Sequence, residues 1–163
     1  MNQMLSVPKR RMWLRAALAM IYALALSSSA AAGPSKIVRG EASGNITSQE
    51  FCSATELCQE STVAGQATQI GQFVGNLSER VDLLTGTYTG TGLFTTSTGD
   101  TLSTESKGNV TPPSPDGRVF FAEDHEIVGG TGRFAAATGE IHVVGTADAD
   151  GNVRVWIVGS LSK

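Results

Sequence analysis

The fold of this chain is decided by the stretch Ile127-Val128-Gly129-Gly130-Thr131-Gly132-Arg133-Phe134-Ala135-Ala136-Ala137-Thr138-Gly139. An apolar β-type segment runs into a glycine-rich turn, a short link of small residues follows, and a second β-type segment begins at Glu140. Because glycine tolerates positive φ and lets two backbones approach closely, this pattern predicts a tight connection between two β-strands.

The same stretch also matches a dinucleotide-binding pattern. Residues 130–135 fit G-x-G-x-x-A, and Asp150 follows about twenty residues on, where a ribose-binding acid is expected. That motif needs a helix directly after the glycines, because the helix N-terminus holds the pyrophosphate. Here Gly139 and the β-branched Ile141 and Val143 follow too soon for a crossover of about ten residues. The pattern therefore indicates a β connection.

The rest of the chain after the leader reads as short β-type runs separated by turn signals, without a helical apolar period. The runs are Lys36 to Ile46, Thr68 to Asn76, Val81 to Leu84, Thr85 to Ser97, Thr101 to Gly108, Arg118 to Val128, Glu140 to Ala147 and Val153 to Leu161. Asp150-Gly151 predicts a hairpin turn before the last run. Many short strands at this spacing predict an antiparallel sandwich or barrel.

The strongest strands are apolar on both faces. In the last one, Val153, Val155, Ile157 and Leu161 alternate with Arg154, Trp156, Val158 and Ser160. In a sheet with one solvent-exposed face, apolar and polar residues would alternate more strictly. Either the outside of a filled barrel meets another subunit, which is the alternative we favour, or a leader or loop covers it.

The N-terminus has the order of an export signal. Lys9, Arg10, Arg11 and Arg15 precede an apolar run, Ala16 to Leu26, and Ala30-Ala31-Ala32 offers a cleavage site before Gly33. Residues 1–32 are thus expected to be a signal peptide, with the mature protein secreted or periplasmic. A retained membrane anchor is the competing interpretation, although the run is shorter than the roughly twenty residues of a span. The twin-arginine route and the general route are both compatible with the basic region.

The composition of the mature chain excludes one class of partner. Removal of residues 1–32 leaves eight basic and fifteen acidic side chains, a formal net charge of −7. Nucleic-acid binding needs a basic footprint, so we expect no nucleic-acid partner. About 130 residues remain, the size of one domain.

Cys52 and Cys58 are the two cysteines of the chain. In an exported protein a pair this close predicts a disulfide. A regular helix over residues 48–61 would compete with the bridge, because six residues of helix span about 9 Å along the axis. We expect an irregular bridged loop, and no zinc site, since two cysteines without a nearby histidine pair fall short of a ligand set.

Four stretches, in this order and spacing, resemble the allene oxide cyclase and dirigent barrel family, in particular its small exported bacterial members. They are Ala67 to Phe73 (ATQIGQF), Thr95 to Leu102 (TTSTGDTL), Ile127 to Gly139, and Trp156 to Leu161 (WIVGSL). The resemblance implies an eight-stranded antiparallel, calycin-like β-barrel with a mostly apolar cavity, often assembled as a trimer. It covers residues 65–163 as the main part of the barrel, preceded by a signal helix and by an N-terminal segment, 33–64, with the Cys52–Cys58 loop.

Plant members of that family cyclise an unsaturated fatty-acid epoxide or guide the coupling of phenolic radicals. Their catalytic residues do not map onto this chain residue by residue, so the resemblance implies fold more than activity. No nucleophile elbow, phosphate loop or metal-spaced histidine cluster is present in the sequence, and we expect no cofactor and no metal.

The one dense polar cluster on a predicted strand is Glu123-Asp124-His125-Glu126. Side chains alternate along a strand, so Glu123 and His125 share one face with Val119, Phe121 and Ile127. If that face turns inward, Glu123 becomes a buried carboxyl group with a raised pKa and a candidate catalytic acid. The alternative is a solvated strand end near the rim. A symmetric hairpin would place His125 opposite His142, either as a metal-binding or pH-sensitive pair or as two exposed histidines.

Six aromatic residues are available to line a ligand cavity, with ordinary core packing as the alternative: Tyr88, Phe94, Phe120, Phe121, Phe134 and Trp156. Of these, Tyr88, Phe94, Phe121 and Trp156 are the candidate ligand-binding residues. The leading functional hypothesis is non-covalent binding of a small apolar or phenolic molecule. A cofactor-free isomerase or cyclase acting on an unsaturated lipid or phenolic intermediate is the second, and a cell-surface structural or interaction module is the third.

Overall fold

The structure is a computed structural model that describes residues 33–163. The predicted signal peptide, its twin-arginine pattern and the alternative membrane anchor lie outside the described residues. Within residues 33–163, no helix is long and apolar enough to cross a membrane. The elements are β1 (Lys36–Phe51), β2 (Glu56–Ala67), β3 (Gly71–Asp82), β4 (Thr87–Thr96), β5 (Thr101–Val110), β6 (Val119–Gly130), the 3₁₀-helix η1 (Gly132–Phe134), β7 (Thr138–Ala147) and β8 (Asn152–Ser162).

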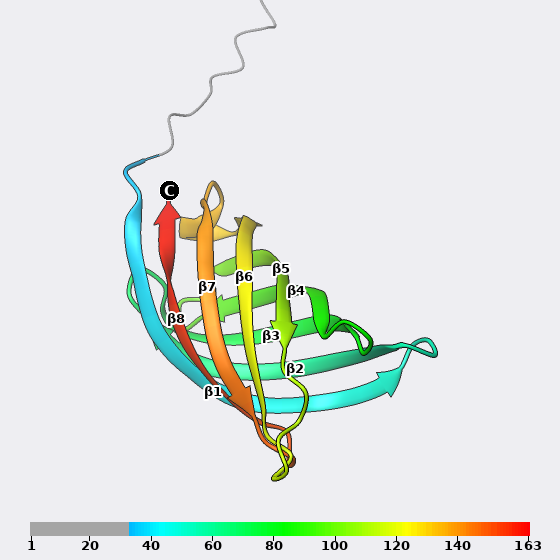
Figure 1. The fold of residues 1–163 in the computed structure, drawn as a ribbon. Helices are drawn as coiled ribbons and strands as arrows, with labels where there is room; N and C mark the ends of the chain where they lie inside the picture. The colour runs from blue at the N-terminus through cyan, green and yellow to red at the C-terminus, as the bar shows by residue number, and fades with distance from the viewer. Residues whose placement is uncertain (1–32) are drawn as a thin grey trace, which may run out of the picture. The chain divides into compact units, whose positions relative to one another are not determined.

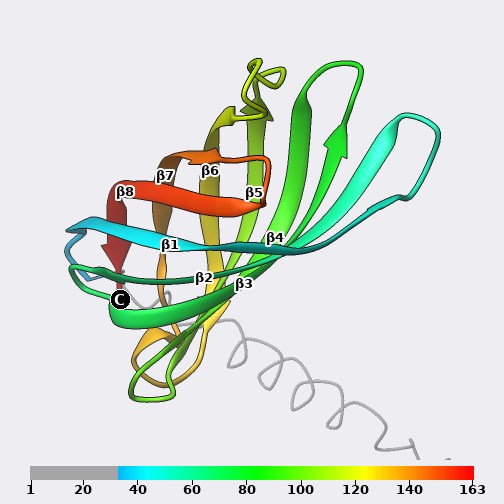
Figure 2. The same ribbon diagram turned by 90° about the horizontal axis from the view of Figure 1, so that it is seen from below.

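The eight strands form a closed antiparallel barrel in which each strand pairs with its neighbours in sequence (Figures 1 and 2). The sheet closes because β1 also pairs with β8, from Lys36 opposite Leu161 to Asn45 opposite Asn152. The predicted all-β barrel is therefore confirmed, and closure leaves no unpaired sheet edge.

Buried and exposed side chains alternate along the strands, and the buried ones form the core. Along β3, Phe73, Leu77 and Val81 are buried, whereas Val74 and Asn76 between them face outward. Most of the other strands repeat this period of two, so one face of the sheet fills the barrel interior.

The barrel begins earlier in the chain than the resemblance implied. Segment 33–64, which we expected to precede the main part of the barrel, supplies β1 and most of β2. Residues 68–70 form a turn, with Gln69 at a φ of 67°, and β3 continues to Asp82. The predicted runs Thr68 to Asn76 and Val81 to Leu84 therefore largely merge into one strand.

The glycine-rich stretch closes one end of the barrel. Gly129 and Gly132 have φ of 151° and 56°, as a tight connection requires, and η1 is only three residues long, which rules out the dinucleotide-binding helix. Phe134 of η1 is fully buried in the core. Arg133 and Lys163 lie over its ring, with the guanidinium carbon and Nζ 4.8 and 4.5 Å from the centroid.

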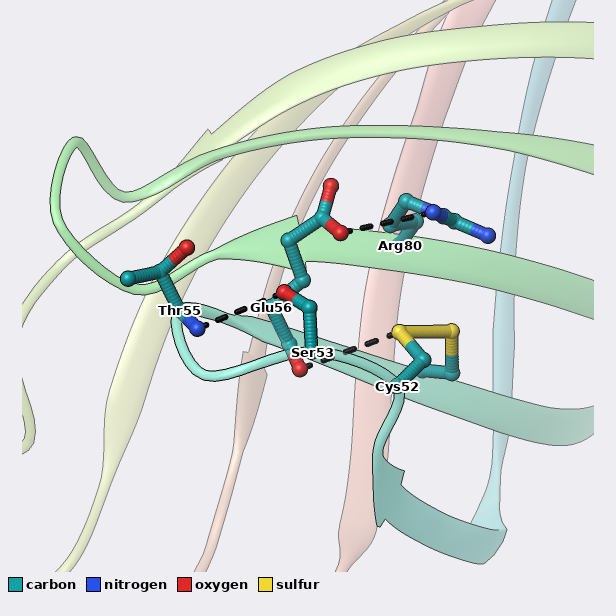
Figure 3. The surroundings of a disulfide bond; sticks show 6 residues. Cys52, Ser53, Thr55, Glu56 and Arg80 are labelled. Carbon is teal, nitrogen blue, oxygen red and sulfur yellow. Dashed lines mark hydrogen bonds and ion pairs between the residues drawn. A yellow bond between two sulfur atoms is a disulfide. The ribbon is translucent and has the colours of Figure 1, made fainter.

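Cys52 and Cys58 form the predicted disulfide, with their Cα atoms 5.7 Å apart (Figure 3). The bridge ties the end of β1 to the start of β2, and residues 48–61 form a hairpin instead of a helix or a wholly irregular loop. Next to the bridge, Arg80 of β3 pairs with Glu56 at 3.4 Å. The connection between β1 and β2 lies at the same end of the barrel as the β3–β4 and β5–β6 connections (Figure 2). We call this end the loop end.

Candidate functional site

The barrel encloses a cavity of about 540 Å³. Its walls are mostly aliphatic and aromatic, and the β3–β4 and β5–β6 loops line its mouth through Leu83 to Gly86 and Thr111 to Pro113. Cavities that hold drug-sized ligands measure about 300–1,000 Å³. The space is therefore large enough for one small apolar molecule.

Glu123 lies inside the barrel and not at a solvated rim. It is 6% exposed, and its two oxygens have separate partners. The Tyr88 hydroxyl donates to Oε2 at 3.2 Å, and His125 Nε2 lies 3.1 Å from Oε1. The predicted candidate acid is therefore a buried carboxyl group in the cavity wall, with a hydrogen bond from Tyr88 and an ion-pair contact to His125.

His125 links this carboxyl group to a third strand. Its ring is 2% exposed, and Nδ1 lies 2.9 Å from the Thr104 hydroxyl of β5. The two ring nitrogens of His125 therefore have different partners, the Glu123 carboxyl group at Nε2 and the Thr104 hydroxyl at Nδ1. The ring also packs edge-on against Phe94, with centroids 6.0 Å apart. These contacts hold the Glu123–His125 pair in one orientation.

The position of Tyr88 depends on a glycine in the strand between it and Glu123. Tyr88 of β4 faces Gly108 of β5, and Gly108 faces Glu123 of β6. A Cβ atom at position 108 would lie 2.6 Å from Tyr88 Cζ and 2.7 Å from its hydroxyl. Gly108 thus leaves the space in which the Tyr88 ring crosses β5. Burial, together with the negative charge of Glu123, raises the pKa of the Tyr88 hydroxyl, so it remains a hydrogen-bond donor.

A second carboxyl group, Glu79 of β3, also lines the cavity. Gln59 Nε2 donates to its Oε2 at 2.5 Å. Burial, and then the charge of Glu123, raises the pKa of Glu79 from 4.5 to about 7. Our sequence interpretation ended this strand at Asn76 and missed Glu79. The alternation of Phe73, Leu77 and Val81, continued through the strand, places residue 79 on the inner face.

Three of the four candidate aromatic residues, Tyr88, Phe94 and Phe121, line the cavity. Trp156 does not: it is 54% exposed on the outside of β8, because its neighbours Val155 and Ile157 turn inward. The expectation that Trp156 lines the cavity is therefore wrong. A ligand-binding role for the other three stays a prediction.

The two histidines are not opposite each other. His142 of β7 faces Asp124, and His125 faces Ile141, one residue away from the register of a symmetric hairpin. His142 is on the outer surface, where Nδ1 lies 2.5 Å from Asp124 Oδ1, and this hydrogen bond raises the pKa of the imidazole. Together with Glu140 these residues offer three ligand atoms within 4.8 Å of one another, outside the cavity.

No family model and no curated protein matches this chain. The barrel, its cavity and the polar cluster in its wall are the evidence from which a function is argued. We call Glu79, Tyr88, Glu123 and His125 the carboxyl cluster below.

Proposed function

We propose that the protein binds a small apolar or phenolic molecule inside the barrel. The observation that carries this proposal is the cavity of about 540 Å³, whose walls are apolar except at the carboxyl cluster and a few other polar side chains. Apolar walls with a few placed polar groups are typical of small-molecule sites, because the walls supply affinity and the polar groups orient the ligand.

Binding of the uncharged dye phenylnaphthylamine tests the proposal, with a matched pair of variants. Val143 lines the cavity, whereas the adjacent Val144 is half exposed on the outside of the same strand. We expect wild-type protein and Val144→Phe to enhance the fluorescence of the dye equally, and Val143→Phe to bind it much more weakly. Absence of binding to the wild-type protein would refute the proposal and favour an interaction module.

A second candidate function is a cofactor-free isomerase or cyclase acting on an unsaturated lipid or phenolic intermediate. What favours it is the presence of three carboxyl groups in the cavity wall, Glu79, Asp82 and Glu123, of which Glu79 has a pKa of about 7. Glu79, which is about half protonated at neutral pH, can donate a proton to a reacting centre. Glu123 is held in place by its contacts with Tyr88 and His125. In this case Glu123→Gln changes turnover of a substrate while its binding stays nearly intact.

Membership of the allene oxide cyclase and dirigent-like family, export and assembly are part of the same proposal. The barrel topology agrees with what the four sequence stretches imply. The disulfide favours an oxidising compartment, outside the cell or in the periplasm. The intact mass of exported protein tests processing: we expect a mature chain that begins at or near Gly33, and a full-length mass in the membrane fraction would replace export with anchoring.

A further inference from the structure

The ionisable groups in the cavity wall are almost all acids. They are Glu79, Asp82, Tyr88, Glu123 and His125, and none of the described residues that line the cavity is Lys or Arg. Glu79 and Glu123 are close enough that the charge of Glu123 raises the pKa of Glu79. The nearest arginine along the chain, Arg80, is exposed and pairs with Glu56 outside the cavity.

We propose that the cavity selects an apolar amine, a molecule with a protonated amino group on a hydrophobic body, and disfavours free carboxylic acids. This inference rests on the proposed ligand binding and names the class of ligand. A carboxylate placed beside Glu79 and Glu123 would add a like charge in a region of low dielectric constant, whereas an ammonium group is attracted there. Hydrophobic ligands with an acid head, such as free fatty acids, therefore fit this wall poorly.

The surroundings of Glu79 suit an ammonium group in two further ways. Glu79 is only partly buried and is one of the residues that line the cavity. The aromatic rings of Tyr88 and Phe94 line the same cavity, and ring faces attract cations. The aliphatic wall, which includes Val63, Leu77 and Val143, accommodates the hydrophobic body.

Binding of an amine is coupled to the ionisation of Glu79. The titratable and hydrogen-bonding groups that act on Glu79 from inside the barrel are Gln59 of β2, Tyr88 of β4, and Glu123 and His125 of β6, with Asp82 further along its own strand. Glu60, on the outer face of β2, acts on Glu79 through its charge alone. An ammonium group favours the ionised form of Glu79, and alkylamines stay protonated to about pH 10. Affinity for an amine should therefore rise from pH 6 to pH 8, with release of a proton on binding.

The experiment is a competition assay with three ligands of equal chain length. Octylamine, octanol and octanoate are each titrated against phenylnaphthylamine bound to wild-type protein at pH 8, and the displacement of the dye is measured. We expect octylamine to bind at least about tenfold more tightly than octanol, and octanoate to bind more weakly than either. We expect the preference for octylamine over octanol to shrink several-fold at pH 6.

Two variants separate charge in the cavity from charge elsewhere. Glu79→Gln should reduce the preference for octylamine over octanol by about tenfold and abolish the pH dependence of that preference. Glu126→Gln removes a charge of the same sign from the exposed face of β6 and should leave all three affinities unchanged. Equal binding of octylamine and octanol, or tighter binding of octanoate, would overturn the inference while dye binding keeps the proposed function. Failure of the dye itself to bind would remove both.

Discussion

Glu79 is an acid whose charged form is disfavoured by the fold. Its pKa rises from 4.5 to about 7, mainly because burial penalises the charged form. An acid with a raised pKa stabilises the folded protein fully below its unfolded pKa. That stabilisation is lost as pH rises from about 4.5 to about 7, because above that range the folded state must hold an unfavourable charge.

The variant Glu79→Gln tests this linkage. Glutamine keeps the shape and a hydrogen bond to Gln59 but carries no charge at any pH. We expect the variant to match wild-type stability near pH 4.5 and to exceed it at pH 8 by on the order of 2–3 kcal/mol, from the size of the shift. Urea unfolding at both pH values measures the difference, with Glu126→Gln as the exposed control. A difference that does not change with pH would contradict the raised pKa.

The sequence predicts two members of the carboxyl cluster, Glu123 and His125, on one strand face, but neither the contact with Tyr88 nor the position of Glu79. The alternation along residues 118–128 placed Glu123 and His125 on one face, but which face turned inward required the barrel itself. Tyr88 reaches Glu123 across a third strand, a contact between residues 35 positions apart that no local pattern shows. Glu79 was missed because the expected strand ended too early, although its period of two continues to Val81.

At the level of the strands, aromatic rings from paired residues fill the space beside glycines that face into the barrel. Gly75 of β3 faces Phe94 of β4, and Gly145 of β7 faces Phe121 of β6. A Cβ atom at position 75 would lie 2.5 Å from a carbon of the Phe94 ring, and one at position 145 would lie 2.5 Å from Phe121 Cζ. These glycines set where the rings lie, so the cavity is the space that the rings leave free.

Gly75→Ala should therefore destabilise the barrel through Phe94. The new methyl group meets only side chains, Phe94 and Val63, so the ring has to move. Overpacking of this kind costs about 1–3 kcal/mol. In a Phe94→Ala background the ring is absent, and the same substitution should cost about 1 kcal/mol less. Chemical unfolding of the four proteins of this double-mutant cycle measures the coupling, and additive effects would show that the ring does not depend on Gly75.

The disulfide stabilises the hairpin of β1 and β2 at the loop end of the barrel. Its closed loop is short, so the chain-entropy model predicts a stabilisation of roughly 2 kcal/mol. We expect the double variant Cys52→Ser, Cys58→Ser to unfold at a correspondingly lower urea concentration. Reductant should lower the stability of the wild-type protein by the same amount and leave the variant unchanged. Free thiols at both positions in peptide maps of exported protein would contradict the bridge.

At the level of the whole molecule, the sequence predicted the type of fold better than its extent. Turn signals such as Asp150-Gly151, where Gly151 has a φ of 80°, are local and were read correctly. Closure of the barrel joins β1 to β8, the two ends of the described chain, and no nearby residue signals that pairing. For this reason the sequence places segment 33–64 before the main part of the barrel, although it holds β1 and most of β2.

The closed barrel leaves an apolar surface on its outside. Phe120, Val144, Trp156 and Val158 of β6, β7 and β8 are each between 50% and 54% exposed. Val144 and Trp156 face each other across β7 and β8. Exposed apolar side chains grouped on neighbouring strands are a candidate interface between subunits. Together with the family resemblance it supports our expectation of a homotrimer.

Light scattering of the mature protein tests this assembly at the scale to which it belongs. We expect a mass about three times that of the monomer, because a closed cyclic assembly buries the same face on every subunit. The double variant Val144→Lys, Trp156→Lys places charges on that face and should give a monomer that still binds dye, since neither side chain lines the cavity. Leu93→Lys, which changes an exposed apolar residue of β4, should leave the assembly intact. A wild-type monomer at micromolar concentration would contradict the trimer and leave the apolar face of β6 to β8 to be covered by another partner.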